Sequence, residues 1–406
     1  MIGLANQLPN VSQDPKDPDF VQDPYVAYRK MRACGDLIYW KEFDLPVAIT
    51  REAVSQVMRH PKMGRAIPEM MQTTPKDGLE AFYRIEQHSL LELEPPEHTR
   101  LRRIVAKAFA LNRMAPLAPR ISQIADSLID AFPKDQDFDL LKAYSQPLTA
   151  LTITSFLGIK EQHALQLQAW SNAMVAMYQA HRDENIEHAA ALAAAEFAEF
   201  ATRELVRRAK LPTDDFLTEL VAAEKSGLLS RSEAISTVIL LLNAGQEATA
   251  HAIGNAVRAL IGFPERMLSL QPEQIANTVE ECLRYAPPLH MFMRHVYQDV
   301  TLFGADIPAG TQIASLLGSS CRDDALWPDS EKFDPFRMRH NHQAFGVGIH
   351  ACTGAALARL ELQVALPALF SRCPNLTITK PPRMADRYHF HGLETLQVRL
   401  EAPAST

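Results

Sequence analysis

The chain has 406 residues, of which 47% are hydrophobic, so it can bury a large core, and its formal net charge is −7. This charge argues against general affinity for nucleic acid or anionic lipid, although it leaves room for a local basic patch. The start of the chain has neither the basic nor the apolar stretch of a leader, and no run reaches the roughly 18 apolar residues of a membrane span. We therefore expect a single cytoplasmic domain over residues 1–406 that binds neither nucleic acid nor membrane.

Helical periodicity dominates the chain. Apolar residues recur at spacings of three and four among Ala, Leu, Glu and Arg, which is typical of amphipathic helices. The predicted helices cover about 97–111, 116–131, 145–158, 163–179, 186–208, 214–224, 231–261, 272–285 and 353–371.

Short β-prone segments complete the pattern. They are a hairpin at 36–50, a region with two turns at 294–317, and two closing runs, NLTITK and LETLQVRL. Between them, residues 318–351 are rich in Asp, Pro, Arg and His and predict a long irregular loop, which in a compact domain is usually functional. The predicted fold class is mainly α with small β regions.

The cysteines do not form an obvious framework. Cys34, Cys282, Cys321, Cys352 and Cys373 are odd in number, widely spaced and without a C-x-x-C pair. This pattern disfavours both a disulfide scaffold and a zinc site. We expect most of them to be reduced and buried.

Cys352 differs from the others because it lies in a glycine-rich segment, FGVGIHACTG, at residues 345–354. Gly346, Gly348 and Gly354 permit tight turns and let a flat cofactor approach the backbone. A helix is predicted to begin just after Cys352, so unpaired amides and the positive helix end would stabilise a thiolate there. A lone cysteine is more often a small buried hydrophobic side chain, and only this context favours an iron ligand.

The pattern F-G-x-G-x-H-x-C-x-G resembles the haem-binding loop of the cytochrome P450 family, and most closely that of its soluble bacterial members. The resemblance extends from DPYVAYRKMR near the start to the closing β runs. It implies the family's single-domain fold over 1–406, without a fused reductase or ferredoxin domain. It also implies haem b, with Cys352 as the axial iron ligand and with Phe345, Gly346 and Gly354 shaping the loop.

A second motif of the family, E-x-x-R, is present as Glu281-Cys282-Leu283-Arg284. Residues three apart share a helix face and can pair, which leaves the guanidinium free to reach a third group. In the family this pair ties the core to the loop before the cysteine, here around residues 333–337. Taken alone, such a pair is usually exposed and contributes about 0.3–0.5 kcal/mol to stability. The structural role is therefore inferred from the position of the motif in the chain.

The haem propionates need charge-assisted donors in a buried site. Four residues match family positions for this role: His98 and Arg102, which lie four apart on one predicted helix, Arg294 in the β region, and His350 before the cysteine. Each one alone is more often an ordinary solvated residue. Together, at motif positions, they favour the propionates.

The helix predicted at 231–261 carries a polar interruption, NAGQEAT, within an apolar sequence. This resembles the oxygen-activation motif of the family, with Ala244 and Gly245 leaving room for dioxygen and Glu247 as the acid. Buried polar groups in a core helix require a purpose. A kinked helix with a solvated glutamate is the structural alternative.

One departure from the family concerns the residue after the acid, which is Ala248 where threonine is usual. The hydroxyl comes one residue later, at Thr249, and one step rotates a side chain by about 100° around a helix. We expect protons to travel through Glu247 and ordered water. The alternative is that Thr249 takes the missing role after a local distortion of the helix at Gly245.

The resemblance implies a monooxygenase that inserts one atom of O2 into an apolar small molecule by hydroxylation or epoxidation. No flavin or iron–sulfur segment is evident, so NAD(P)H would act only indirectly, through a separate ferredoxin and ferredoxin reductase. A basic docking face is predicted from Arg100, Arg103, Lys107, Arg113, Arg337 and Arg339. These residues are equally explained as solubilising charges. We expect a monomer.

The predicted substrate pocket is rich in Met and Phe, which suits an adaptable apolar site but equally suits a core. Its residues are Ile67, Met70, Met71, Phe82, Leu90, Met174, Met177, Leu240, Leu289, Met291, Phe292 and Phe390, with Ala244 and Ala248. Terpenoid, steroid, fatty-acid, macrolide and aromatic substrates stay open. Two other functions are also open: a peroxide-driven peroxygenase, which Ala248 favours, and a non-catalytic haem sensor, which Glu247 disfavours.

Overall fold

The computed structural model describes residues 2–72, 76–178, 182–338 and 341–401. The chain forms two compact units. Unit 1 comprises Met1–Gln72, Gly254–Cys352 and Lys380–Leu396, and unit 2 comprises Thr73–Ile253, Thr353–Thr379 and Gln397–Thr406. The long helix α13 (Arg231–Ile261) carries the chain from unit 2 into unit 1.

Unit 1 holds most of the β structure. Its helices are α1 (Ile2–Ala5), α2 (Pro18–Gln22), α3 (Tyr25–Arg32), α4 (Arg51–Arg59), η1 (Glu69–Met71), α14 (Arg266–Ser269), α15 (Ile275–Tyr285) and α16 (Leu317–Ser320). Its strands are β1 (Asn10–Val11), β2 (Leu37–Trp40), β3 (Leu45–Ala48), β4 (Met63–Gly64), β6 (Met291–Val296), β7 (Val300–Leu302), β8 (Ala305–Ile307), β9 (Gln312–Leu316), β11 (Arg383–Met384) and β12 (Leu393–Thr395).

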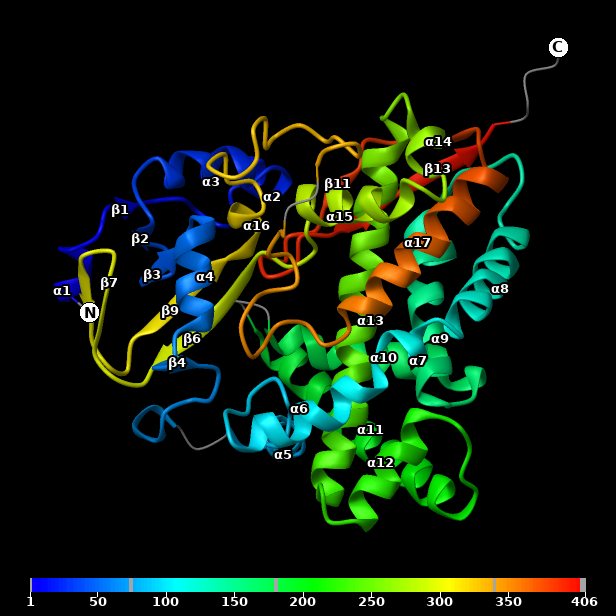
Figure 1. The fold of residues 1–406 in the computed structure, drawn as a ribbon, viewed down its shortest axis with the longest axis horizontal. Helices are drawn as coiled ribbons and strands as arrows, with labels where there is room; N and C mark the ends of the chain where they lie inside the picture. The colour runs from blue at the N-terminus through cyan, green and yellow to red at the C-terminus, as the bar shows by residue number, and fades with distance from the viewer. Residues whose placement is uncertain (1, 73–75, 179–181, 339–340, 402–406) are drawn as a thin grey trace. The chain divides into compact units, whose positions relative to one another are not determined.

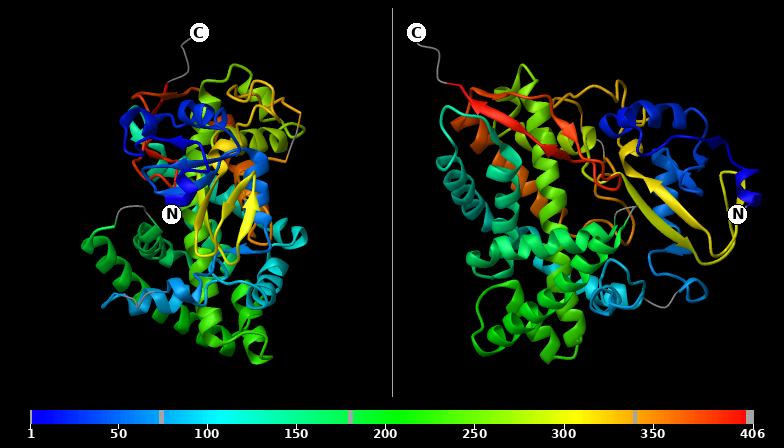
Figure 2. Two further views of the ribbon diagram at one scale, coloured as in Figure 1. Left: turned by 90° about the vertical axis from the view of Figure 1, so that its left-hand side faces the viewer. Right: turned by 180° about the vertical axis from the view of Figure 1, so that it is seen from behind.

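Six of these strands form one sheet in the order β1-β2-β3-β9-β6-β4 (Figures 1 and 2). The predicted hairpin at 36–50 is confirmed, since β2 and β3 pair antiparallel with Leu37 opposite Ala48. β6 and β9 also pair antiparallel, which confirms the predicted β region. Helix α4 packs on this sheet through Val54 and Val57. The sequence analysis missed α4, although Thr50 caps it by accepting from the Ala53 amide.

Unit 2 is almost entirely helical. Its helices are α5 (Glu80–Glu86), α6 (Glu97–Ala108), α7 (Leu111–Met114), α8 (Leu117–Asp130), η2 (Leu141–Ser145), α9 (Gln146–Leu157), η3 (Glu161–His163), α10 (Ala164–Val175), η4 (Ala176–Tyr178), α11 (Glu184–Lys210), α12 (Phe216–Lys225), α13 up to Ile253, and α17 (Ala355–Arg372). Its strands are β5 (Phe138–Asp139), β10 (Leu376–Ile378) and β13 (Gln397–Leu400), which form a sheet in the order β10-β13-β5.

The apolar stripes of these helices meet in one core. Phe197 of α11, Leu220 of α12, Leu242 of α13 and Leu357 of α17 all belong to it and are almost fully buried. α8 and α17 lie side by side in this unit (Figure 1). Each predicted helix in this unit has an observed counterpart within a few residues, because the three-and-four spacing marks the face that packing buries. The predicted fold class, mainly helical with small sheets, is confirmed.

A buried glutamic acid in this unit, Glu361, allows the burial of α17 to be tested through the pH dependence of stability. Glu361 of α17 is 1% exposed, and its Oε2 has no hydrogen-bond partner. Burial raises the pKa of Glu361 well above its ordinary value. The folded protein therefore holds a proton that the unfolded chain releases above a pH of about 4.3. The stability that this proton contributes is complete below that pH and falls as the pH rises towards the raised pKa of the folded state.

We therefore expect Glu361→Gln to be more stable than the wild type at pH 7.5, with a difference that disappears towards pH 4.5. The amide keeps the shape of the neutral acid but carries no proton that the unfolded chain can lose. Thermal unfolding of both proteins over a pH series measures the difference. A difference that does not change with pH would contradict a neutral Glu361.

Candidate active site

The cysteine loop of unit 1 is closed by its own backbone. The Cys352 amide donates to the Phe345 carbonyl over 2.8 Å, and the Gly346 amide donates to the Gln343 carbonyl over 2.8 Å. Gly348 has φ +82°, and a Cβ there would lie 2.6 Å from the Met58 carbonyl oxygen. Only glycine fits this position, so the loop is pressed against the end of α4. The Cys352 side chain itself is exposed.

The residues after Cys352 start a helix, as the sequence predicts. α17 begins at Ala355, and the Ala358 amide donates to the carbonyl of Gly354, the N-cap residue. The amides of the first turn have no acceptor within the helix, and the helix start carries partial positive charge. A thiol close to such amides ionises more readily. A cysteine sulfur in this position has the chemistry of a metal ligand.

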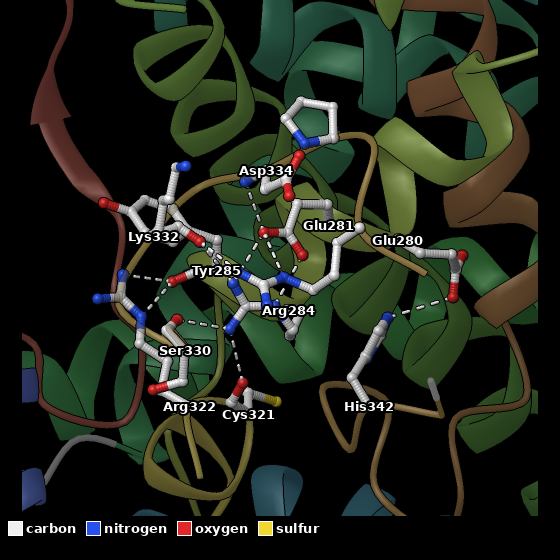
Figure 3. Close-up of polar contacts among 12 residues, drawn as sticks. Glu280, Glu281, Arg284, Tyr285, Cys321, Arg322, Ser330, Lys332, Asp334 and His342 are labelled. Atoms are coloured by element: carbon white, nitrogen blue, oxygen red, sulfur yellow. Dashed lines mark hydrogen bonds and ion pairs between the residues drawn. The ribbon is translucent and has the colours of Figure 1, made fainter. Parts of the chain in front are cut away.

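Glu281 and Arg284 form a buried ion pair on α15 (Figure 3). Arg284 Nε donates to Glu281 Oε2 over 2.7 Å and Arg284 Nη2 donates to Oε1 over 2.8 Å, while the two side chains are only 3% and 4% exposed. The same guanidinium donates to the carbonyls of Cys321, Ser330 and Lys332 over 2.8–3.1 Å. The Asp334 amide in turn donates to Glu281 Oε1 over 2.9 Å. The pair thus fastens α15 to residues 321–334, a tie of the kind that the sequence predicts.

A second contact from α15 reaches the segment that precedes the cysteine loop. His342 Nε2 lies 3.2 Å from Glu280 Oε2, and the His342 side chain is almost fully buried (Figure 3). Asn277 Nδ2 donates to the carbonyls of Pro335 and Arg337. Sequence reasoning missed these residues because each partner is distant in the chain and no local spacing connects them.

In unit 2, α13 is continuous through the polar interruption, which argues against the distortion that Thr249 would need. Thr249 is buried at 6% exposure, whereas Ala244 is exposed in the middle of a core helix. The surface of α13 is therefore exposed at Ala244. Gly245 also packs closely against α9, since a Cβ there would lie 3.0 Å from Ile153 Cδ1; its predicted role in leaving space for dioxygen stays a prediction.

The acid in the polar interruption of α13, Glu247, lies near His251. Glu247 Oε1 lies 3.7 Å from His251 Nε2, one turn further along α13. One turn before Glu247, Asn243 Nδ2 lies 3.8 Å from Met174 Sδ of α10. Sequence reasoning identified Glu247 by its motif but missed His251, although the four-residue spacing was the available signal.

The four candidate propionate ligands lie in both units. In unit 2, His98 is buried near the start of α6 and Arg102 follows it by one turn, half-buried. In unit 1, Arg294 is only 2% exposed in β6, where its Nη1 donates to the Met293 carbonyl over 2.9 Å, and His350 is half-buried. A buried guanidinium is stable only near an anion or strong acceptors. In unit 1, the buried Arg294 and the half-buried His350 are donors of the kind that a carboxylate group needs.

Comparison with known proteins decides the family. A family model described as Cytochrome P450 matches residues 54–387. The chain belongs to the cytochrome P450 family. It is 34% identical to Cytochrome P450 107B1 of Saccharopolyspora erythraea over 94% of this chain and 96% of that protein. It is 36% identical to the Mycinamicin IV hydroxylase/epoxidase of Micromonospora griseorubida over 80% of this chain and 79% of the relative.

The fold of this P450 also matches solved structures. The myxobacterial cytochrome P450 CYP267B1 in complex with myristic acid superimposes with a TM-score of 0.85 at 30% identity, covering 95% of this chain and 98% of the other. The protein is therefore a cytochrome P450 monooxygenase of the bacterial type, and its family implies a haem with a cysteine thiolate ligand. The exposed Cys352 thiol and the buried Arg294 fit such a group. Among the described residues, no helix has the length and apolarity needed to span a membrane.

The predicted pocket residues of this P450 differ in burial. Phe82, Leu90, Met174, Met177 and Met291 are buried. Met71, Leu240, Leu289, Phe292 and Phe390 are half-buried. Ile67 is 51% exposed, so it is no core residue. The side chain of Met70 lies outside the described part of the structure. In unit 1, Leu289 and Phe390 are bridged by their backbones, which supports their placement on one wall.

Three residues of the predicted docking face have partners within the protein. Arg100 Nη2 lies 2.5 Å from Glu233 Oε1, and Arg113 pairs with Asp214 and Glu219. Arg337 donates to the carbonyls of Pro328, Asp329 and Lys332. These charges have partners within their own unit, and the docking face stays a prediction. Arg103 and Lys107 are exposed, whereas Arg339 lies outside the described residues.

A buried aromatic cluster beside β6 has no counterpart in the sequence analysis. Tyr28 Oη lies 2.9 Å from His290 Nδ1 and Tyr25 Oη lies 3.3 Å from His290 Nε2. Burial, together with the nearby Arg322 charge, lowers the pKa of His290 to about 3. A Cβ at Gly318 would lie 2.7 Å from the His290 ring. The cluster therefore fixes the segment between α15 and β6, next to the predicted wall residue Leu289.

Proposed function

We propose that this P450 inserts one atom of O2 into a C–H bond or a double bond of a large apolar molecule while the other atom leaves as water. A separate ferredoxin and its reductase would supply the electrons from NAD(P)H. The observation that carries the proposal concerns α13. This core helix bears the acid Glu247, and Ala244, three residues before it, is exposed. A haem carrier or sensor needs no acid there, so this feature favours catalysis.

The bound haem would supply oxygen activation, and the chain's own residues would tune and protect it. Cys352 would hold the iron through its sulfur, with the first-turn amides of α17 limiting the charge that the sulfur donates. His98, Arg102, Arg294 and His350 would bind the propionates, and Phe345 and Gly346 would shape the loop beneath the ring. Glu247 would hold and release protons at its carboxylate.

The substrate is proposed to be bulky and apolar. One relative is named as a mycinamicin IV hydroxylase/epoxidase, and another, 32% identical, as the Vitamin D(3) 25-hydroxylase of Pseudonocardia autotrophica. In this chain, Met174 and Met177 supply flexible thioether side chains from α10 and η4 that adapt to large apolar shapes. Both observations favour a macrolide, sterol or fatty-acyl skeleton over a small aromatic ring.

The test begins with two probes from different classes, mycinamicin IV and myristic acid. We expect at least one of them to shift the spin state of the ferric haem in an optical titration, because a bulky apolar ligand displaces water from the pocket. Turnover with ferredoxin, reductase, NADH and O2 should then give a product carrying one more oxygen atom. Product with hydrogen peroxide but none with the electron-transfer proteins would instead establish a peroxygenase. A spectral shift without product from either oxidant would favour a sensor.

A further inference from the structure

Four polar side chains follow one face of α13 at intervals of one turn: Asn243, Glu247, His251 and Asn255. The rest of this helix is mainly apolar and packs into the cores. A line of polar groups along a core helix costs stability unless the groups have partners or a function. The centre of the line is the acid that the proposed function uses.

Glu247 and His251 are in direct electrostatic contact. Glu247 Oε1 lies 3.7 Å from His251 Nε2, and the two side chains are 11% and 12% exposed. Each group is therefore largely withdrawn from water but still reached by it. The separation exceeds an ordinary hydrogen bond, so a proton crosses after a small side-chain rotation or through one water molecule.

The position of this pair favours proton transfer over stabilisation. A contact this deeply buried contributes little net stability even when both groups are charged, because desolvation offsets the attraction. Ala248 lies between the two residues of the pair and its side chain has no donor, so the helix lacks a hydroxyl at the position after the acid. Imidazole is the side chain that both accepts and releases protons near neutral pH.

We propose that His251 is a positioning residue that hands protons to Glu247, an inference that rests on the proposed function. In each transfer the Nε2–H bond of the imidazolium breaks and an O–H bond forms on Glu247, which leaves neutral imidazole and a carboxylic acid. A proton taken up from the solvent then restores the imidazolium. Each turnover consumes O2, two electrons, two protons and the substrate, and it yields the oxidised substrate and one water, so the relay acts twice.

Asn243 provides the side to which Glu247 can pass the protons that it receives from His251. Its amide nitrogen faces Met174 Sδ at 3.8 Å, since sulfur is an acceptor, and its Oδ1 is buried without a protein partner. A buried acceptor of this kind usually meets an ordered water. A water bound to Asn243 Oδ1 would lie one turn from Glu247, on the side opposite His251. Protons thus enter the acid from His251 and leave it towards Asn243.

The experiment compares His251→Gln and His251→Arg with the wild type and with His188→Gln, the same change at an exposed position of α11. All are measured as holoenzymes with ferredoxin, reductase, NADH and O2, with myristic acid present. Gln keeps a hydrogen-bonding group without a titrating proton, and Arg keeps the positive charge but does not release its proton. We expect both His251 variants to consume NADH about tenfold more slowly, with a larger solvent deuterium isotope effect and more peroxide released per NADH.

Two further readouts separate a relay from a structural role. Myristic acid affinity, read from the optical titration, should stay within about twofold of the wild type. NADH consumption rates of Glu247→Gln, His251→Gln and the double variant should be non-additive, because each single change interrupts the same proton path, whereas their melting temperatures should differ little. Wild-type rates and peroxide yields in His251→Arg would show that the charge alone matters and would overturn the relay. Failure of the proposed function looks different: the wild type itself then gives no oxygenated product from O2 with either probe.

Discussion

Replacing Cys352 by serine is expected to abolish the thiolate spectrum and all oxygenation. Serine is close in size, so the loop closed by the Cys352 and Gly346 amides should keep its shape. Its hydroxyl, however, is a far weaker ligand for haem iron than a thiolate and does not push electron density onto it. The expected loss of product is complete within detection. The optical spectrum of the reduced carbon-monoxide complex measures the change.

Two comparisons make this result specific. Cys34 is also exposed, and its Sγ lies 3.4 Å from the Lys30 carbonyl oxygen, so Cys34→Ser tests loss of an accessible thiol elsewhere. It should leave both spectrum and activity unchanged. Cys352→His should bind haem but move the carbon-monoxide band to the position typical of histidine ligation. A thiolate spectrum that persists in Cys352→Ser would assign the iron to another ligand.

The helices could be predicted from local sequence patterns, because apolar residues at spacings of three and four form the helix face that is buried. α13 was predicted with the bounds that the structure gives it, Arg231–Ile261. The same reasoning missed α4, a helix of nine residues whose signal was only Thr50 followed by a short apolar stripe. Short helices offer too few turns for a periodicity to emerge.

Contacts in the site could be predicted where both residues belong to one local motif. They could not be predicted where the two residues are distant in the sequence. Glu281 and Arg284 are three residues apart, so their pairing followed from the sequence. Nothing in the sequence indicated that Ile153 of α9 would fill the space beside Gly245, or that Glu233 would neutralise Arg100. Such contacts depend on how helices pack, which a spacing rule does not contain.

The second large effect is expected at Glu281 and Arg284. Removing either side chain leaves the other charge buried without its partner, which costs about 3–5 kcal/mol. Arg284→Ala in addition leaves the carbonyls of Cys321, Ser330 and Lys332 without a donor. Segment 321–334 then loses three of its hydrogen bonds to α15, which loosens the chain that leads to Cys352. We expect both alanine variants to unfold at lower denaturant concentration and to retain little haem.

The exposed pair Glu199–Arg203 on α11 provides the matched control. Arg203 Nη1 lies 2.6 Å from Glu199 Oε1, as close as the buried pair, but the side chains are 72% and 59% exposed. Water therefore screens the attraction, and Arg203→Ala should change stability by less than about 1 kcal/mol. Denaturant unfolding and the haem-to-protein absorbance ratio measure all variants under the same conditions. Arg284→Lys keeps the charge but loses the fork that reaches Glu281 and the carbonyls together, so it should rescue only part of the loss. Full haem loading and wild-type stability in both Glu281→Ala and Arg284→Ala would show that burial of this pair contributes nothing to holding the cysteine loop.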